Sequence, residues 1–305
     1  MVVVFGSINV DFVTRVARFP VPGETLAAES FAVYAGGKGA NQALAAALAG
    51  ATVQLYGAVG RDAFAEIALE LLDAAGVELG GVARVFEPTG SATILVDARA
   101  ENCIAIAAGA NARAEPEAVP DGALGAATTL VLQHEVPASA NAALVTRARS
   151  RGARIVLNAA PARPLALEVL RQLDVLVVNE GEAAALASLY RWPIEPMVFA
   201  AAAAAESSRL AVVVTLGSKG AIACRAGERL SAAAPEVRVV DTTGAGDAFV
   251  GVLAAALDRR ASLRDALARA VAAGTLACSM NGAQPSLPDS AAIDALLPLV
   301  TTAAG

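Results

Sequence analysis

The sequence is poor in aromatic residues, cysteine, histidine and lysine. Only 4% of the 305 residues are aromatic, and the chain has three cysteines, one histidine and two lysines. The cysteines (Cys103, Cys224 and Cys278) are odd in number and form no C-x-x-C pair. This argues against a disulfide framework and against a zinc site, and it favours a reducing cytosol.

Long hydrophobic runs and basic clusters are missing as well. No stretch of eighteen apolar residues runs without glycine, proline or charge, so no segment is expected to span a membrane. The N-terminus turns polar at Ser7, Asn9 and Asp11 and lacks the basic region of a secretion signal. The net charge is -6 without any basic block, which disfavours nucleic-acid binding because phosphate contacts need clustered Lys and Arg. We expect a small-molecule partner and a cytoplasmic location.

Short β-forming runs alternate with alanine- and leucine-rich stretches along most of the chain. The expected strands are 1–5, 53–59, 129–133, 154–157, 175–178 and 211–216. The expected helices are 41–48, 64–72, 138–149, 182–189 and the alanine run 200–205. Alternation of this kind, with continuous apolar strands, predicts a three-layer αβα sandwich around a mostly parallel sheet, in one α/β domain over 1–305.

Two segments, about 12–34 and 84–107, interrupt this alternation. In both, Thr, Val and Ile alternate with polar residues and no helix intervenes, which indicates antiparallel strands. Two excursions of this kind from an α/β body would form a small antiparallel sheet that packs over one end as a lid. Ordinary surface hairpins are the alternative interpretation.

The strongest motif is the run 241–249, Asp-Thr-Thr-Gly-Ala-Gly-Asp-Ala-Phe, which lies between an expected strand at 237–240 and a helix. Gly244 and Gly246 would let the backbone approach a ligand, and the free amides of a first helical turn attract negative charge. The turn therefore suits a phosphoryl group. Asp247 could instead cap the helix, although a cap needs no flanking glycines. The run lacks the third glycine of a dinucleotide fingerprint, and no Walker A sequence is present.

A second glycine-rich turn, Ala-Gly-Gly-Lys-Gly-Ala-Asn-Gln at 35–42, also precedes an expected helix. Its Lys38 and Asn41 supply hydrogen-bonding groups suited to hydroxyls. Asn9 and Asp11 alternate onto one face near the end of the first strand, where open α/β sheets bind ligands.

Two further strand ends carry weaker candidates. The run 215–220 is a strand that enters a glycine turn, and Asn179 follows the strand 175–178. Both lysines, Lys38 and Lys219, lie in glycine turns, which fits either anion sites or a general bias toward arginine. Each of these could be an ordinary turn.

Together these residues resemble the ribokinase family of carbohydrate kinases, also called the PfkB family. Residues 36–42 are similar to its N-terminal signature and residues 241–251 to its C-terminal one, and the resemblance runs from Gly6 to about Leu297. Within the family, the ribokinase subgroup is matched at 9–11, 101–102, 108–111, 132–135, 158–162 and 282–286. The resemblance implies ATP-dependent phosphorylation of D-ribose at its 5-hydroxyl.

The resemblance also implies roles for individual residues. Asp247 would be the base that accepts the hydroxyl proton, while the amides of Gly244, Ala245 and Gly246 stabilise the developing charge. The implied sugar-binding residues are Asn9, Asp11, Gly37, Lys38, Gly39, Ala40, Asn41, Glu135 and Asp247. The implied ATP-binding residues are Asn179, Thr215, Leu216, Gly217, Ser218, Lys219, Gly220, Gly246, Asp247 and Val271. Val271 is a departure, because the subgroup often has a polar residue there, near adenine.

Two metal ions and a dimer are implied in the same way. Glu182 would hold Mg²⁺ through water on the nucleotide side. A K⁺ ion beside the phosphate turn would be held by Asp241, Thr243, Ala277, Met280, Gly282 and Ser286, several of them through backbone carbonyls. Pairing of two lid sheets into a homodimer would cover their exposed edges.

Three alternatives stay open at this point. A sister kinase would act on fructose, a deoxyribose, a nucleoside or 2-keto-3-deoxygluconate. Asn9, Asp11 and Glu135 favour a small polyhydroxy sugar, since a nucleobase would need an apolar or aromatic platform. A non-catalytic sugar-binding regulator is disfavoured by the intact Asp247, and a nicotinamide-dependent dehydrogenase by the missing fingerprint.

Overall fold

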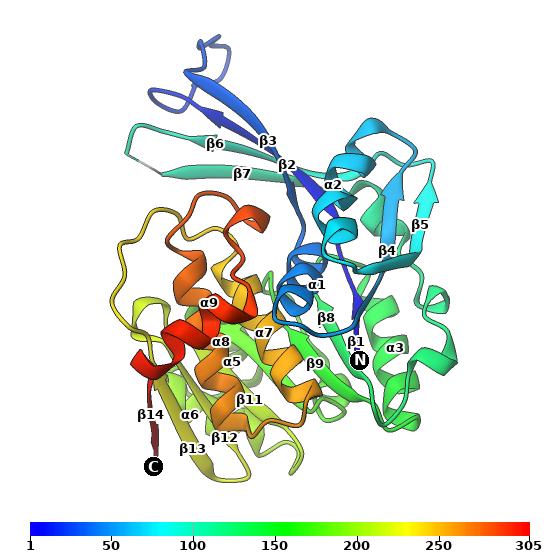
Figure 1. Cartoon of the computed structure of the whole chain (residues 1–305), viewed down its shortest axis with the longest axis vertical. Helices are drawn as coiled ribbons and strands as arrows, with labels where there is room; N and C mark the ends of the chain where they lie inside the picture. The colour runs from blue at the N-terminus through cyan, green and yellow to red at the C-terminus, as the bar shows by residue number, and fades with distance from the viewer. Residues whose placement is uncertain (100) are drawn as a thin grey trace.

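The computed structural model describes residues 1–99 and 101–305, and its body is built on a ten-stranded sheet (Figure 1). The strands lie in the order β14 (Thr301–Ala304), β13 (Glu228–Ala233), β12 (Ala221–Arg225), β11 (Ala211–Thr215), β10 (Val175–Asn179), β9 (Arg154–Asn158), β8 (Thr129–Gln133), β1 (Val2–Phe5), β4 (Val53–Gly60) and β5 (Glu78–Val85). From β11 to β5 all neighbours are parallel, whereas β12, β13 and β14 extend the sheet antiparallel. The expected mostly parallel sheet is confirmed.

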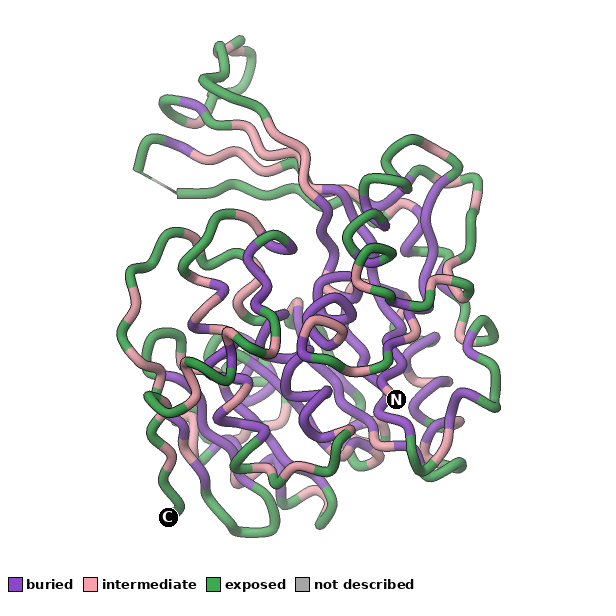
Figure 2. Tube along the Cα trace, in the orientation of Figure 1, coloured by how far each residue is buried: buried purple, intermediate pink, exposed green. Residues whose placement is uncertain are grey.

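Helices cover both faces of this sheet, and the residues of β1 alternate between the two layers. Val2 and Val4 belong to the layer that contains α1 (Lys38–Leu48), α2 (Ala63–Ala74), α7 (Ala245–Asp258), α8 (Leu263–Ala277) and α9 (Ser290–Leu296). Val3 and Phe5 belong to the layer of α3 (Ala138–Ser150), α4 (Leu167–Leu170), α5 (Glu180–Tyr190) and α6 (Pro196–Ala204). Successive strand residues face opposite sides, so a strand buried on both faces must be apolar throughout. Figure 2 shows this interior as a continuous buried region. No helix in the described part of the chain combines the length and apolar character needed to cross a bilayer.

A separate four-stranded sheet projects from one end of the body (Figure 1). Its strands lie in the order β3 (Ser30–Gly36), β2 (Asn9–Arg15), β6 (Gly90–Val96) and β7 (Asn102–Ala107). The hairpins β2–β3 and β6–β7 are antiparallel as expected, but the central pairing of β2 with β6 is parallel. A parallel pair needs a long crossover, which α1, β4, α2 and β5 provide. Of the expected segment 84–107, residues 84–85 belong to β5, and Ala100 lies outside the described residues.

The expected strand at 237–240 is wrong. Residues 234–244, between β13 and α7, form neither a strand nor a helix. The sheet neighbours of β13 are β12 and β14, so no edge is left beside it for another strand. Val240 instead donates its N–H to the Cys278 carbonyl at 2.8 Å, and the Val239 and Val240 side chains are 60% and 47% exposed. β-branched residues favour strands only where a partner and a buried face exist.

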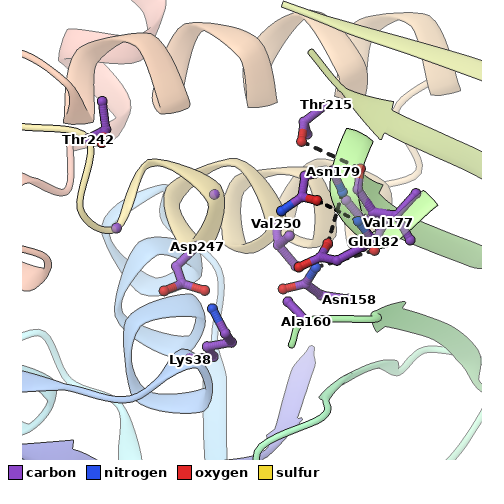
Figure 3. Close-up of a pocket in the computed structure, with 13 residues that line it drawn as sticks. Lys38, Asn158, Ala160, Val177, Asn179, Glu182, Thr215, Thr242, Asp247 and Val250 are labelled. Carbon is purple, nitrogen blue, oxygen red and sulfur yellow. Dashed lines mark hydrogen bonds between the residues drawn. The ribbon is translucent and has the colours of Figure 1, made fainter. Parts of the chain in front are cut away.

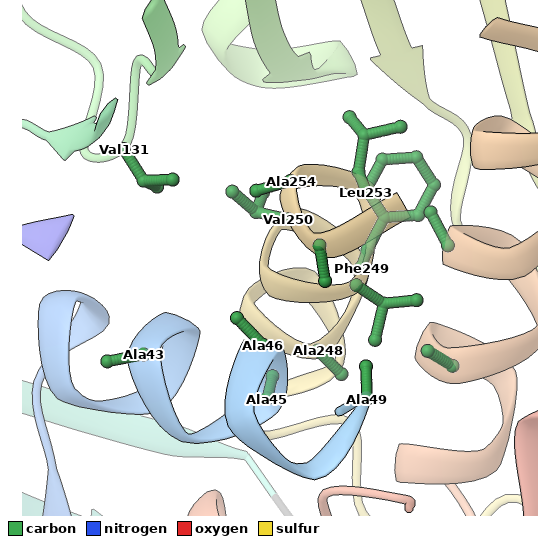
Figure 4. Packing of buried hydrophobic residues seen from close by; sticks show 14 of the residues in the cluster. Ala43, Ala45, Ala46, Ala49, Val131, Ala248, Phe249, Val250, Leu253 and Ala254 are labelled. Atoms are coloured by element: carbon green, nitrogen blue, oxygen red, sulfur yellow. The ribbon is translucent and has the colours of Figure 1, made fainter. Parts of the chain in front are cut away.

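Close packing of α1 on α7 joins the two glycine-rich turns (Figure 4). A Cβ on Gly251 of α7 would lie 2.5 Å from the Gln42 carbonyl oxygen and 2.6 Å from Ala45 Cβ on α1. Figure 4 shows Ala45, Ala46 and Ala248 at this contact. Because these residues are small, the helices approach closely and their first turns meet.

Candidate active site

A cleft of about 220 Å³ lies where β9, β10 and β11 end, beside the first turn of α7 (Figure 3). Open α/β sheets bind ligands at this edge because the strand ends and the helix N-termini meet there. The cleft brings together seven of the residues predicted from the sequence: Lys38, Asn179, Glu182, Thr215, Gly244, Gly246 and Asp247. They come from five separate elements, so the fold, rather than any one motif, assembles this site.

The first turn of α7 forms one wall of the cleft. Helix α7 begins at Ala245, and Gly244 at its N-cap has a positive φ of 80°. A Cβ on Gly244 would lie only 2.9 Å from Ala283 Cα, so both the conformation and the space require glycine. Gly246 and Asp247 follow in the first turn, where amide N–H groups have no intrahelical partner and the helix dipole attracts anions. This wall is suited to a phosphoryl group.

Asp247 and Lys38 point toward one another across the cleft (Figure 3). Asp247 is only 8% exposed. Its carboxylate accepts hydrogen bonds from Asn41 Nδ2 and Gln42 Nε2, each at 2.9 Å. The charge of Asp247 raises the pKa of Lys38, which burial alone would lower. Lys38 therefore stays an ammonium at neutral pH. A carboxylate able to take a proton thus lies beside a cation able to stabilise phosphate oxygens.

Asp11 and Glu135 are two further carboxylates near Lys38. Glu135 Oε2 accepts hydrogen bonds from Ser7 Oγ at 2.6 Å and from the Lys38 amide at 3.1 Å. Burial, followed by the charges of Glu135 and Asp247, raises the pKa of Asp11 to about 6, and Lys38 opposes this rise. Carboxylates in this arrangement can accept hydrogen bonds from several hydroxyls of one ligand.

Asn9 is the first residue of β2, the strand that carries Asp11. Its Oδ1 accepts a hydrogen bond of 2.6 Å from Asn111 Nδ2, while the Asn111 Oδ1 accepts one of 2.9 Å from the Ile8 amide. Asn111 is 1% exposed, so it fixes this strand junction from inside the protein. Because Asn9 Oδ1 is occupied, the Nδ2 group of Asn9 is the end left to donate to a ligand.

The remaining predicted sugar-side residues hold the start of α1 against the end of β1. Gly37 has a φ of 91°, and a Cβ there would lie 2.7 Å from the Asn9 amide nitrogen. A Cβ on Gly39 would lie 2.6 Å from the Gly6 carbonyl carbon, and the Ala40 amide donates to the Ser7 carbonyl at 2.9 Å. These residues act through close backbone packing that places Lys38 and Asn41.

The nucleotide-side residues divide into two groups. Asn179 caps α5 through a capping box: its Oδ1 accepts from the Glu182 amide at 2.8 Å, and Glu182 Oε2 accepts from the Asn179 amide at 2.9 Å. Burial raises the pKa of Glu182, although the Asn179 amide and Lys38 act in the opposite direction. Thr215 ends β11 and also lines the cleft.

The second group lies away from this cleft. Gly217, Ser218 and Lys219 are exposed in the short helix η4 (Gly217–Lys219), and neither they nor the flanking Leu216 and Gly220 line the cleft. Val271 is 3% exposed on α8, within the core layer of α1 and α7. The structure therefore does not bring the predicted purine-contact residue to the described cleft.

Asp241 ties the phosphate turn to the segment after α8. Its Oδ1 accepts from the Thr243 amide at 2.9 Å and Oγ1 at 2.7 Å, and its Oδ2 accepts from the Gly282 amide at 2.9 Å. Burial would raise the pKa of Asp241, but these hydrogen bonds outweigh it and lower that pKa. Of the other predicted cation residues, Ala277 ends α8, Met280 is 53% exposed, and Ser286 Oγ donates to the Ala283 carbonyl at 2.8 Å. Carboxylate, hydroxyl and carbonyl oxygens are donors of the type that hard cations prefer.

Four residues that contribute to the site received no role from the sequence: Ser7, Gln42, Asn111 and Asn158. Their polar side chains are all at least 93% buried, and each hydrogen-bonds to a predicted site residue or to another member of the group. Gln42 directly follows Asn41 and is the last residue of the run 36–42 that resembles the N-terminal family signature, but neither fact indicated its contact with Asp247. The partners of the others lie about 100 residues away in the chain.

Comparison with known proteins agrees with this geometry. Residues 1–290 match the pfkB family carbohydrate kinase. A ribokinase from Lactococcus lactis is 38% identical, with 96% of each chain covered. The structure of a Thermotoga maritima ribokinase is similar, with a TM-score of 0.90 and 32% identity over 97% of this chain and 99% of that one. So is the Arabidopsis thaliana ribokinase complexed with ribose and ATP, with a TM-score of 0.87 and 34% identity over 97% and 98%. The chain belongs to the pfkB family of carbohydrate kinases.

Proposed function

We propose that this chain transfers the γ-phosphoryl group of ATP to the 5-hydroxyl of D-ribose. The observation that carries the proposal is the buried carboxylate of Asp247 on a glycine turn, facing Lys38 and lying near Asp11. Similarity to ribokinases, one of them complexed with ribose and ATP, supports ribose as the sugar. In this proposal the 5-hydroxyl, a primary alcohol, is the group that reaches Asp247.

In the proposed reaction, Asp247 takes the proton of the sugar hydroxyl while the hydroxyl oxygen bonds to the γ-phosphorus. The bond from that phosphorus to the bridging oxygen of ADP breaks, and ADP leaves with the electron pair. Lys38 and the first-turn amides around Gly244, Ala245 and Gly246 stabilise charge on the transferring group. Asn9, Asp11 and Glu135 hold the other sugar hydroxyls and so orient the reacting one.

ATP would bind along Asn179 and Thr215, with its γ-phosphate at the turn of α7. Mg²⁺ fits the carboxylate of Glu182, because this ion takes one or two carboxylates together with water and phosphate oxygens. The ion neutralises phosphate charge when bound. K⁺ fits the oxygens around Asp241, Thr243 and Gly282, with Ala277, Met280 and Ser286 as further candidates.

The four-stranded sheet would act as a lid, because it carries Asn9 and Asp11 into the site from β2. Closing it would exclude water from the γ-phosphoryl group and so prevent hydrolysis. Phe31, Ile104 and Ile106 of this sheet are 61%, 50% and 59% exposed, and pairing with the lid of a second copy would cover them. We expect a homodimer in the cytoplasm. Light scattering of the purified chain measures the oligomeric state.

The test is a coupled ADP-release assay with ATP, Mg²⁺ and K⁺. The substrates are ribose, 2-deoxyribose, fructose, adenosine and 2-keto-3-deoxygluconate. The proposal predicts that ribose has by far the highest kcat/KM. A higher value for another sugar would assign the chain to a sister kinase, and inactivity on all five would favour a sugar-binding regulator.

A further inference from the structure

A set of buried amide side chains leads from the cleft into the protein interior, and the proposed reaction does not use it directly. The set consists of Gln133, Gln42 and Asn158. Gln133 Nε2 donates to Gln42 Oε1 at 2.8 Å, and Gln42 Nε2 donates both to Asn158 Oδ1 at 3.0 Å and to Asp247 Oδ1 at 2.9 Å. Gln42 and Gln133 are 0% exposed, and neither lines the cleft.

We propose that Gln42 is a positioning residue for phosphoryl transfer, which holds one oxygen of the Asp247 carboxylate from inside the protein. This inference rests on the proposed function, since it assigns Gln42 a role through the base of that reaction. Gln42 itself touches no substrate, because its whole side chain is buried behind Asp247.

The hydrogen-bond pattern fixes the orientation of the Gln42 amide. An ionised carboxylate only accepts hydrogen bonds, so the group that Gln42 turns toward Asp247 must be its NH₂. Asn158 Nδ2 donates to the Val177 carbonyl at 3.2 Å, which leaves Asn158 Oδ1 to accept the second hydrogen of that NH₂. The oxygen of Gln42 then faces Gln133, which donates to it. Every contact of the Gln42 side chain is therefore satisfied in one orientation only.

The two oxygens of Asp247 are held by consecutive residues of α1, and these two residues differ in surroundings. Asn41 Nδ2 donates to Oδ2, and the Asn41 Oδ1 atom is buried without a hydrogen-bond partner among the described residues. An unpartnered amide oxygen can accept a hydroxyl, so Asn41 can exchange its bond to Asp247 for bonds to the sugar. Gln42 has no such freedom, because all of its bonds are internal. The reacting hydroxyl would then meet Oδ2 while Gln42 keeps Oδ1 in place.

Fixing one carboxylate oxygen matters for the rate rather than for binding. Proton transfer needs Oδ2 within hydrogen-bond reach of the hydroxyl, and a carboxylate free to rotate about its last bond would reach it only part of the time. Loss of one hydrogen bond to a charged group corresponds to a change of about 10- to 100-fold. The expected signature of a Gln42 variant is a fall in kcat of this order, with the KM values for ribose and ATP nearly unchanged.

The experiment measures kcat and both KM values for the wild-type chain, Gln42→Met and Asn141→Leu. Asn141 is the matched control: it is a buried amide 6% exposed, and its side chain donates to the Gln133 backbone carbonyl at 2.6 Å rather than to Gln42 or Asp247. Gln42→Met loses three buried hydrogen bonds and Asn141→Leu loses one, so both should melt at a lower temperature. Only Gln42→Met should have a lower kcat than wild type. Equal kcat values for Gln42→Met and wild type, or a rise in the KM for ribose at unchanged kcat, would overturn the inference.

A double-mutant cycle tests whether Gln42 acts through Asp247. In an Asp247→Asn background the Gln42→Met change should cost little further activity, because the group that Gln42 positions has already lost its function. Equal fold losses in the two backgrounds would refute the proposed coupling. If Gln42→Met does not fold, Gln133→Met removes the donor that orients Gln42 and should lower kcat several-fold. No loss in that variant would overturn the inference, whereas a wild-type chain inactive on ribose would overturn the proposed function itself.

Discussion

Replacing Asp11 by Asn should make the ligand-free protein more stable at neutral pH while it weakens sugar binding. Asp11 is half-buried, and its pKa is raised by the charges of Glu135 and Asp247, with Lys38 as the one opposing charge among the described residues. Its pKa is raised from an ordinary value of 3.8 to about 6. The native protein therefore holds this proton more tightly than the unfolded chain does.

The sign and size of the effect follow from this difference. A raised native pKa contributes stability that is fully present below pH 4 and is lost as the pH rises through about 6. The rise of about two pKa units corresponds to about 3 kcal/mol in the free energy of unfolding. The side-chain amide of an Asp11→Asn variant does not titrate, so this variant should escape the loss at pH 7 to 8.

Urea unfolding of wild type and Asp11→Asn without ligands, from pH 4.5 to 8, measures the effect. About 1 kcal/mol of the effect is already lost at pH 4.5, so the stability of the variant relative to wild type should grow by about 2 kcal/mol between pH 4.5 and 8. Asp73→Asn, which removes a carboxylate exposed on α2, controls for the loss of one negative charge. A difference in stability between Asp11→Asn and wild type that stays constant or shrinks with rising pH would show that the pKa of Asp11 is not raised in the native protein. Calorimetry with ribose should show weaker binding by the same variant, because the ribose hydroxyls lose the charged acceptor of their hydrogen bonds.

Three further predictions concern the site. Asp247→Ala should lower kcat by about 10²- to 10⁴-fold while ribose still binds, because the base is lost but the sugar contacts remain. Steady-state kinetics and calorimetry measure the two effects, and near-normal turnover would exclude Asp247 as the base. Asn111→Leu should raise the KM for ribose more than the KM for ATP, since Asn9 loses the bond that fixes its amide; equal changes in both would contradict this role. At fixed ATP and Mg²⁺, activity should be higher in K⁺ than in Na⁺, and Asp241→Asn should reduce this difference in rate between the two salts. Equal rates of the wild type in both salts would argue against a cation site at Asp241.

The parts of the fold that were predicted correctly are those with strong local patterns. The strands 129–133 and 175–178 and the alanine helix at 200–205 carry continuous apolar runs or strong helix formers, and the structure has an element at each. The run 237–240 is equally β-branched, yet it has no free sheet edge beside it. Propensity cannot distinguish these cases, because the position of a sheet edge depends on β14, about sixty residues further along the chain.

The site divides in the same way. Glycine turns such as the one around Gly244 indicate where backbone must approach a ligand, and they located the cleft. Gln42 was missed because its role depends on Gln133, Asn158 and Asp247, which the fold brings to it from three other elements. Val271 was placed by resemblance alone, and its helix turns it into the core. Buried polar partners distant in the sequence are the contacts that no local pattern encodes.

In the proposed reaction this chain phosphorylates the 5-hydroxyl of ribose with Asp247 as the base. Phosphorus NMR of the product formed from ribose, ATP, Mg²⁺ and K⁺, followed over time for wild type and Asp247→Ala, tests it most directly. We expect a single sugar phosphate whose phosphorus couples to the C5 methylene protons, formed at least about a hundredfold more slowly by the variant. A phosphate on another hydroxyl, or equal rates for both proteins, would contradict it.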